Sequence, residues 1–187
     1  IISARNQPDL PLSLTVEVLP FDLAKNRWEY SIYYRGKLAD QPTIGSELKS
    51  PQQYEAEILN MKQHGVEMPA DYIGFSRQPD GSFDFSRLEQ AMEIRKRLGV
   101  TRGPIPIVFA AGGINFGGFV KETDPAKKQT MLKQAIEATK ALRKFCRRGG
   151  YPQMLVYAMD EGRIHVIAAE RPMMQAIAET GGGTCVA

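Results

Sequence analysis

Two adjacent carboxylates, Asp160 and Glu161, end the short apolar run 155–159 and are the residues best suited to catalysis. The run is too short for a helix and follows a Gly-Gly pair and Pro152, so we interpret it as a buried strand. The carboxyl ends of strands are where ligand sites form in barrels and open α/β sheets. Two acids in different environments can divide acid–base catalysis, one ionised and one protonated.

A second interpretation of the same residues is a β-hairpin. In it, 156–158 and 164–167 are antiparallel strands, and Asp160-Glu161-Gly162-Arg163 is an exposed acidic turn. The pattern of the rest of the chain favours the first interpretation, which requires a helix to follow Glu161.

After Trp28, strand and helix patterns alternate four times, and a glycine follows each predicted helix. The four predicted strands cover 30–34, 72–75, 105–111 and 155–159. Helices are expected to start at Ser50-Pro51 and at Asp124-Pro125, each an N-cap followed by proline. A fifth strand begins near Cys185. Alternation of strands and helices predicts a parallel sheet with crossover helices.

The predicted fold class is α/β, and residues 29–187 fit the first half of a (β/α)8 TIM barrel. An open doubly wound sheet is the alternative, but the glycine-rich phosphate turn typical of that fold is absent after the first strand. Upstream, residues 10–19 alternate apolar and polar as a half-buried strand does. We interpret residues 1–28 as the last strand of an upstream β-sandwich plus a linker.

Arg35 ends the first predicted strand and would lie at the same mouth as the two acids. Its planar guanidinium suits neighbouring hydroxyls or a carboxylate, although an internal ion pair to Asp160 or another acid is an alternative role. Four further candidates for polar and stacking contacts to a sugar ring lie in the loop after the third strand or at strand ends: Asn115, Phe116, Tyr34 and Phe75. Each of these alone is also a common packing residue.

Composition and charge describe an ordinary globular chain. Of the 187 residues, 43% are hydrophobic and 24% are charged, with a net charge of +3. That charge is too small to predict binding to nucleic acid or to an anionic membrane, and no apolar run is long enough to predict membrane insertion. The basic cluster Arg143-Lys144 and Arg147-Arg148 falls at a predicted helix C-terminus, which the helix dipole explains better than a phosphate site.

Neither the cysteines nor the histidines suggest a metal site. Cys146 and Cys185 lack metal-ligand spacing and imply no disulfide framework, and His64 and His165 have no partner at a suitable spacing. No metal or cofactor is predicted, and the oligomeric state is not determined. The chain opens on isoleucine rather than methionine, so whether the full-length protein is secreted or periplasmic stays open.

Five short motifs point to a known family: Val18-Leu-Pro-Phe21, the run from Tyr54 to Gly65, Phe83-Asp-Phe85, Gly149-Gly-Tyr-Pro152 and Tyr157-Ala-Met-Asp-Glu161. Together they resemble the start of the catalytic barrel in bacterial glycoside hydrolases similar to family 123 and related domains of unknown function. The resemblance covers most of residues 12–187, and the tyrosine-x-x-aspartate-glutamate run is its most specific motif.

The resemblance implies a retaining, substrate-assisted hydrolase of glycans that contain N-acetylhexosamine. Asp160 would orient the 2-acetamido group whose carbonyl oxygen attacks the anomeric carbon. Glu161 would protonate the leaving oxygen and then activate water. Arg35 would hold hydroxyls of the terminal sugar, by analogy with the first-strand arginine of family 20 hexosaminidases.

Two departures and two alternatives accompany this resemblance. Gly162-Arg163 follows the acids where relatives often have proline, and strands five to eight are absent, so this stretch alone is predicted to be inactive. The alternatives are an ordinary retaining glycosidase with its nucleophile in the missing half, and a non-catalytic carbohydrate-binding or structural barrel. An oligosaccharide is the expected partner in each case except the structural one.

Overall fold

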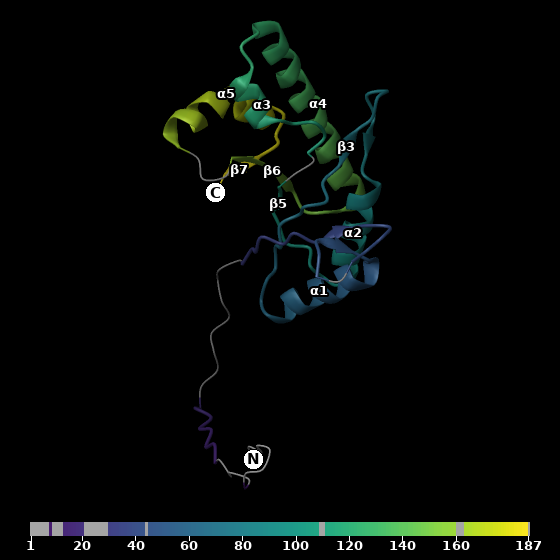
Figure 1. Ribbon diagram of the computed structural model, residues 1–187, viewed down its shortest axis with the longest axis vertical. Coiled ribbons are helices and arrows are strands. Elements are labelled where there is room, and N and C mark those ends of the chain that lie inside the picture. The colour runs from purple at the N-terminus through teal and green to yellow at the C-terminus, as the bar shows by residue number, and fades with distance from the viewer. Residues whose placement is uncertain are drawn as a thin grey trace.

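The computed structural model describes residues 8, 13–20, 30–43, 45–108, 111–159 and 163–186 of the chain. Within these residues, helices and parallel strands alternate along much of the sequence (Figure 1). The protein is therefore of the α/β class, as the sequence predicted.

A three-stranded parallel sheet lies at the centre of the fold. Its strands are β5 (Ile105–Ile107), β6 (Met154–Met159) and β7 (Thr184–Val186), hydrogen-bonded in that order. Each is short and apolar and follows a glycine-containing turn, which agrees with the strands expected at these places.

Two extended segments continue the sheet beyond β5, although neither forms a regular strand. Residues 68–75 make isolated parallel bridges to the β5 region, at Asp71 with Ile107 and at Phe75 with Ala111. Residues 30–34 lie beyond them, where the amide of Ala70 donates to the carbonyl oxygen of Ile32 at 2.9 Å. The segments therefore lie in space in the order of the sequence, as predicted, but with fewer ladder hydrogen bonds than two full strands would make.

Proline and glycine explain this irregular pairing. Pro69 and Pro106 carry no amide hydrogen and so cannot donate to a ladder. Gly74 has a φ of 63°, a left-handed conformation that interrupts an extended segment. Its amide donates to a carboxylate oxygen of Asp71 at 2.8 Å rather than to a neighbouring strand.

The first helix, α1 (Pro51–Gln63), starts where the sequence predicts it. Ser50 and Gln53 form a reciprocal capping box. The backbone amide of Gln53 donates to Ser50 Oγ at 3.2 Å, and the backbone amide of Ser50 donates to Gln53 Oε1 at 2.8 Å. These bonds satisfy backbone donors that the first helical turn leaves unpaired.

Helices α1 and α2 (Ser86–Arg97) pack together and enclose a small core. Tyr54 and Ile58 of α1 are fully buried in it. Tyr34 and Ile73, from the two extended segments, pack against the same core. The two helices thus cover one side of the first half of the sheet.

The second half of the sheet is covered by α4 (Pro125–Gly149) and α5 (Ile164–Glu179). Both contact β6, and α5 also contacts the short helix α3 (Phe116–Lys121), so the three helices gather on one side of β6 and β7 (Figure 1). The Asp124 side chain caps α4 as predicted, accepting from the Ala126 amide at 2.8 Å. The main core between these layers includes Ile105, Ile107, Met154, Val156, Leu142 and Ile177.

Helix α5 decides between the two interpretations of the sequence around the acidic pair. Residues 164–167, which the hairpin interpretation requires as an antiparallel strand, are the first residues of α5. The hairpin interpretation is therefore wrong, because β6 pairs in parallel with β5 and β7 and a helix follows it. Apolar alternation over four residues is too short to override this tertiary packing.

Two small ladders were not predicted. Strands β1 (Lys37–Leu38) and β2 (Leu48–Lys49) pair in parallel before α1. Strands β3 (Ser76–Arg77) and β4 (Phe83–Asp84) pair antiparallel between the second segment and α2.

The predicted strand at residues 10–19 is not seen in its described part. Residues 13–19 carry no strand assignment, and Leu14, Val16 and Val18 are each at least 72% exposed. A strand needs a neighbour for its backbone hydrogen bonds. Most of the proposed residue 1–28 domain lies outside the described residues.

Among the described helices, none is both long and apolar enough to cross a membrane.

Candidate functional site

A hollow of about 330 Å³ opens at the carboxyl edge of the sheet. It lies between the face of the sheet that carries Tyr33 and Tyr72, the end of β6 and the loop that leads from β5 into α3. Its lining is aromatic and apolar with one amide, and includes Tyr33, Tyr72, Val108, Asn115, Phe116 and Tyr157. Concave, mostly apolar sites with a few polar groups are the usual form of small-molecule sites.

Three tyrosines from three segments of the sheet form one side of this hollow. The ring of Tyr33 meets those of Tyr72 and Tyr157 edge to face, with centroid distances of 5.6 and 5.8 Å. Tyr72 is 5% exposed, whereas Tyr33 is 47% exposed. An aromatic ring offers an apolar face with a polar hydroxyl at its tip. Such a cluster can pack against the C–H face of a sugar ring and bond its hydroxyls.

The sequence analysis did not single out these tyrosines as a set. Its nearest candidate, Tyr34, follows Tyr33 directly and so points to the opposite side of the extended segment. Side-chain alternation in the sequence is the signal that could have found the set. Each tyrosine alternates along its segment with the residues that pack under the helices, so it occupies the opposite face.

Asn115 lines the hollow and also starts α3. Its side-chain oxygen accepts from the Gly118 amide at 2.8 Å, which leaves its amide nitrogen as a donor for another group. A Cβ on Gly118 would lie 2.6 Å from that nitrogen, so a larger residue there would displace the Asn115 side chain. Phe116, the other candidate from this loop, lines the hollow while being only 5% exposed within the main core.

Arg35 lies beside the hollow rather than in its lining. Its guanidinium forms an ion pair with Glu47 and lies 5.8 Å from the ring centroid of Tyr72. Lys37 also pairs with Glu47, at 3.1 Å, and approaches the same ring. The alternative role expected for Arg35, an internal ion pair, is therefore present, with Glu47 as the partner.

Phe75 lies in the main core, Tyr34 packs partly buried against the smaller core, and neither is in the lining. The Tyr34 hydroxyl donates to Glu57 at 2.8 Å, and burial together with this bond raises the pKa of Tyr34. Phe75 is 3% exposed, and its ring stacks on Phe85 at a centroid distance of 4.6 Å. Both side chains face the helices.

A buried polar network behind the sheet holds the segment that carries Tyr72. Arg95 of α2 donates to the Tyr54 hydroxyl at 2.8 Å and to the carbonyl oxygens of Pro69 and Ala70 at 2.7 and 3.1 Å. Asp71, the residue that follows Pro69 and Ala70, is 1% exposed. Burial raises the pKa of its carboxyl group, and Arg95 opposes that shift. Arg95 thus fixes the backbone just before Asp71, and Asp71 accepts from the Gly74 amide just after it.

The predicted catalytic pair, Asp160 and Glu161, lies outside the described residues. In the sequence the pair comes directly after β6, whose Tyr157 lines the hollow, and shortly before α5. Arg35, Asn115 and the end of β6 all belong to the carboxyl edge, because the segments that precede them run parallel. The catalytic roles stay predictions.

Within the described ranges, no group of three or more His, Cys, Asp or Glu side chains could hold a metal ion. The lining of the hollow likewise includes no carboxylate from these ranges. The described part of the lining is neutral, with aromatic, aliphatic and amide groups. The resemblance to glycoside hydrolase family 123 stays a prediction as well, since comparisons of the chain with protein-family models, with curated proteins and with solved structures found no match.

Proposed function

We propose that this chain forms the first half of a (β/α)8 barrel in a glycoside hydrolase that acts on glycans containing N-acetylhexosamine. The observation that carries the proposal is the tyrosine-lined hollow at the carboxyl edge of the sheet. Strand β6, which contributes Tyr157 to its lining, is followed directly in sequence by the acidic pair. Sites of barrel enzymes lie at this edge.

The half-barrel is supported by the order and direction of the sheet segments. Five extended segments run parallel in sequence order. Helices pack on one side of them, and the three tyrosines lie on the other. In a closed barrel, the tyrosine side would face the interior. Residues 1–28 would supply the last strand of an upstream β-sandwich, a proposal that rests on the alternation of residues 10–19 alone.

In the proposed reaction, the carbonyl oxygen of the 2-acetamido group attacks the anomeric carbon as the glycosidic bond breaks. Asp160 would accept a hydrogen bond from the acetamido nitrogen and so orient this nucleophile. Glu161 would give its proton to the leaving oxygen and then remove a proton from the water that opens the cyclic intermediate. The configuration at the anomeric carbon would be retained.

The described residues would bind and position the sugar. Tyr33, Tyr72 and Tyr157 would pack against its ring, and the free amide nitrogen of Asn115 would donate to a hydroxyl or to the acetamido oxygen. Arg35, held by Glu47 over Tyr72, would contact hydroxyls further from the bond that breaks. None of these groups needs to change its protonation state.

A non-catalytic carbohydrate-binding barrel is the second candidate. One observation favours it, namely that the lining of the hollow is complete as a binding surface without any carboxylate from the described residues. An ordinary retaining glycosidase is a variant of the first candidate, with Glu161 as acid/base and a nucleophile supplied from outside this sequence.

The test compares Glu161→Gln and Asp160→Asn in the full-length protein on two N-acetylhexosaminides, one with a poor and one with an activated aryl leaving group. Glu161→Gln should lower kcat about 10²- to 10⁴-fold on the poor leaving group, the usual range for general acid catalysis. It should lower kcat much less on the aryl glycoside, whose departure needs little protonation. Asp160→Asn should impair both substrates, because the nucleophile is needed in each case.

A sugar without the acetamido group supplies the control, since Asp160→Asn should change its hydrolysis little. Equal losses for both variants on both substrates would remove the substrate-assisted mechanism. No hydrolysis by the unmodified protein, together with retained binding of the same glycosides, would favour the non-catalytic candidate.

A further inference from the structure

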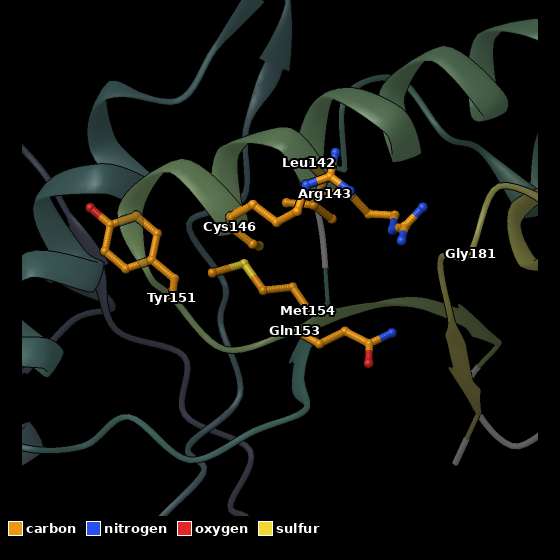
Figure 2. A pocket seen from close by; sticks show the side chains of 8 residues that line it. Leu142, Arg143, Cys146, Tyr151, Gln153, Met154 and Gly181 are labelled. Atoms are coloured by element: carbon orange, nitrogen blue, oxygen red, sulfur yellow. The ribbon is translucent and has the colours of Figure 1, made fainter.

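A second hollow, of about 260 Å³, lies at the opposite end of the same strands. It is bounded by the C-terminal third of α4, the start of β6 and the turn between α5 and β7. Its lining is Leu142, Arg143, Cys146, Arg147, Tyr151, Gln153, Met154 and Gly181. Figure 2 shows Cys146 and Met154 near the middle of this hollow, with Tyr151 at one end and Gly181 at the other.

The floor of this hollow is apolar and buried. Leu142, Cys146 and Met154 are 2%, 7% and 4% exposed and belong to the main core. Gln153 at the start of β6 is exposed, and its amide can both donate and accept hydrogen bonds. The hollow therefore combines a wall suited to a hydrocarbon body with a polar rim.

Two arginines one helical turn apart, Arg143 and Arg147, supply the charge of the rim. Arg143 donates to the carbonyl oxygen of Thr180 at the end of α5, which holds its guanidinium beside Gly181. A Cβ on Gly181 would lie 2.7 Å from that guanidinium, so glycine leaves the space that the arginine occupies. Among the described residues, no carboxylate forms an ion pair with either arginine.

The neighbouring Arg148 behaves differently and shows that the helix dipole is not the whole explanation. Arg148 pairs with Glu89 at 3.2 Å and lines another surface with Phe83 and Phe85. The dipole favours cations in the last turn of α4, where Arg147 and Arg148 lie. It does not explain why Arg147 shares an apolar-floored hollow with Arg143 and has no acid among the described residues to pair with.

We propose that this hollow binds a small organic phosphate monoester, with its phosphate between Arg143 and Arg147 and its apolar body on Leu142, Cys146 and Met154. A phosphate monoester carries a charge near −2 at neutral pH, which matches two guanidinium groups, whereas a carboxylate matches one. Arginine pairs bind phosphate with directed, charge-assisted hydrogen bonds. The volume is below the range of about 300–1,000 Å³ typical of drug-sized ligands, so the ligand is small.

The experiment titrates phenyl phosphate into the full-length protein by calorimetry, with inorganic phosphate and benzoate as comparison ligands. We expect phenyl phosphate to bind at least tenfold more tightly than either. Inorganic phosphate lacks the apolar body, and benzoate lacks the second charge.

Arg147→Gln is the test variant, because Arg147 is exposed and its loss leaves the core intact. It should weaken phenyl phosphate binding at least tenfold. Arg148→Gln removes the same charge one residue away and should change the affinity less than twofold. No measurable binding, equal affinity for inorganic phosphate or benzoate, or equal losses in the two variants would each overturn the proposal. A thermal melt of both variants checks that they are folded.

Discussion

The two hollows at opposite ends of β6 share a strand but not a chemistry. At the carboxyl edge, Val156 and Tyr157 contribute to a lining of tyrosines and one asparagine amide. At the amino edge, Gln153 and Met154 contribute to a lining with two arginines. Each hollow rests on core residues and takes its polar character from the connections around it, the β5–α3 loop in one and the end of α4 in the other.

The comparison shows how one sheet can carry two hollows of different chemistry. A strand presents alternate side chains to its two faces and ends in different connections at its two edges. The floor residues of each hollow are fixed by core packing. The rim residues differ between the two hollows, and under the two proposals they would decide which ligand fits.

The largest expected effect is on stability, and it distinguishes a buried lining residue of the carboxyl-edge hollow, Phe116, from an exposed one, Tyr33. Phe116→Ala should lower the free energy of unfolding by about 3–5 kcal/mol, because it removes a large side chain from the core. Tyr33→Ala should lower it much less, since Tyr33 is 47% exposed. Urea unfolding of both variants measures this. Similar losses would mean that the rim of this hollow is also part of the core.

The second prediction concerns the pH dependence that Cys146 adds at the amino edge. Burial raises the pKa of its thiol from 9.0 to about 11. Between these pH values the unfolded chain loses the thiol proton while the folded chain keeps it. Stability should therefore fall by about 2–3 kcal/mol as the pH rises from about 9 to about 11.

Cys146→Ala isolates this contribution, because other groups titrate alike in both proteins. The difference in unfolding free energy between the unmodified chain and Cys146→Ala should shift by that amount over the same pH range. A constant difference would show that the thiol is accessible to water and that the floor of the hollow is open.

The smallest effect tests whether the two hollows act independently. Tyr33→Ala should weaken binding of N,N′-diacetylchitobiose about three- to tenfold, the range expected for losing one aromatic contact. It should leave phenyl phosphate binding unchanged. Arg147→Gln should weaken binding of phenyl phosphate and leave binding of N,N′-diacetylchitobiose unchanged. Calorimetry with both ligands on both variants is the measurement, and crossed effects would show that β6 couples the two ends.

Several features of this fold could be predicted from neighbouring residues alone. The helix starts at Ser50-Pro51 and Asp124-Pro125 follow from side chains that cap the first turn and from a proline that needs no hydrogen bond there. The parallel order of the strands follows from their alternation with helices. The same alternation correctly favoured a helix over a hairpin after the acidic pair.

The residues that line the two hollows could not be predicted in the same way. Tyr33 and Tyr34 are chemically identical neighbours, yet one lines the carboxyl-edge hollow and the other bonds Glu57 under α1. Which of them faces the helices depends on the register of residues 30–34 against residues 68–75. That register is set by hydrogen bonds between distant parts of the chain.

The basic cluster of α4 makes the same point at the other edge. Its position near a helix C-terminus is a local property that the sequence alone determined, through the helix dipole. Its division into Arg148, which pairs with Glu89, and Arg143 and Arg147, which line a hollow, was decided only when α2, α5 and β6 packed around α4. Caps and dipoles act within a helical turn, whereas a cavity and an ion pair need surfaces brought together from across the chain.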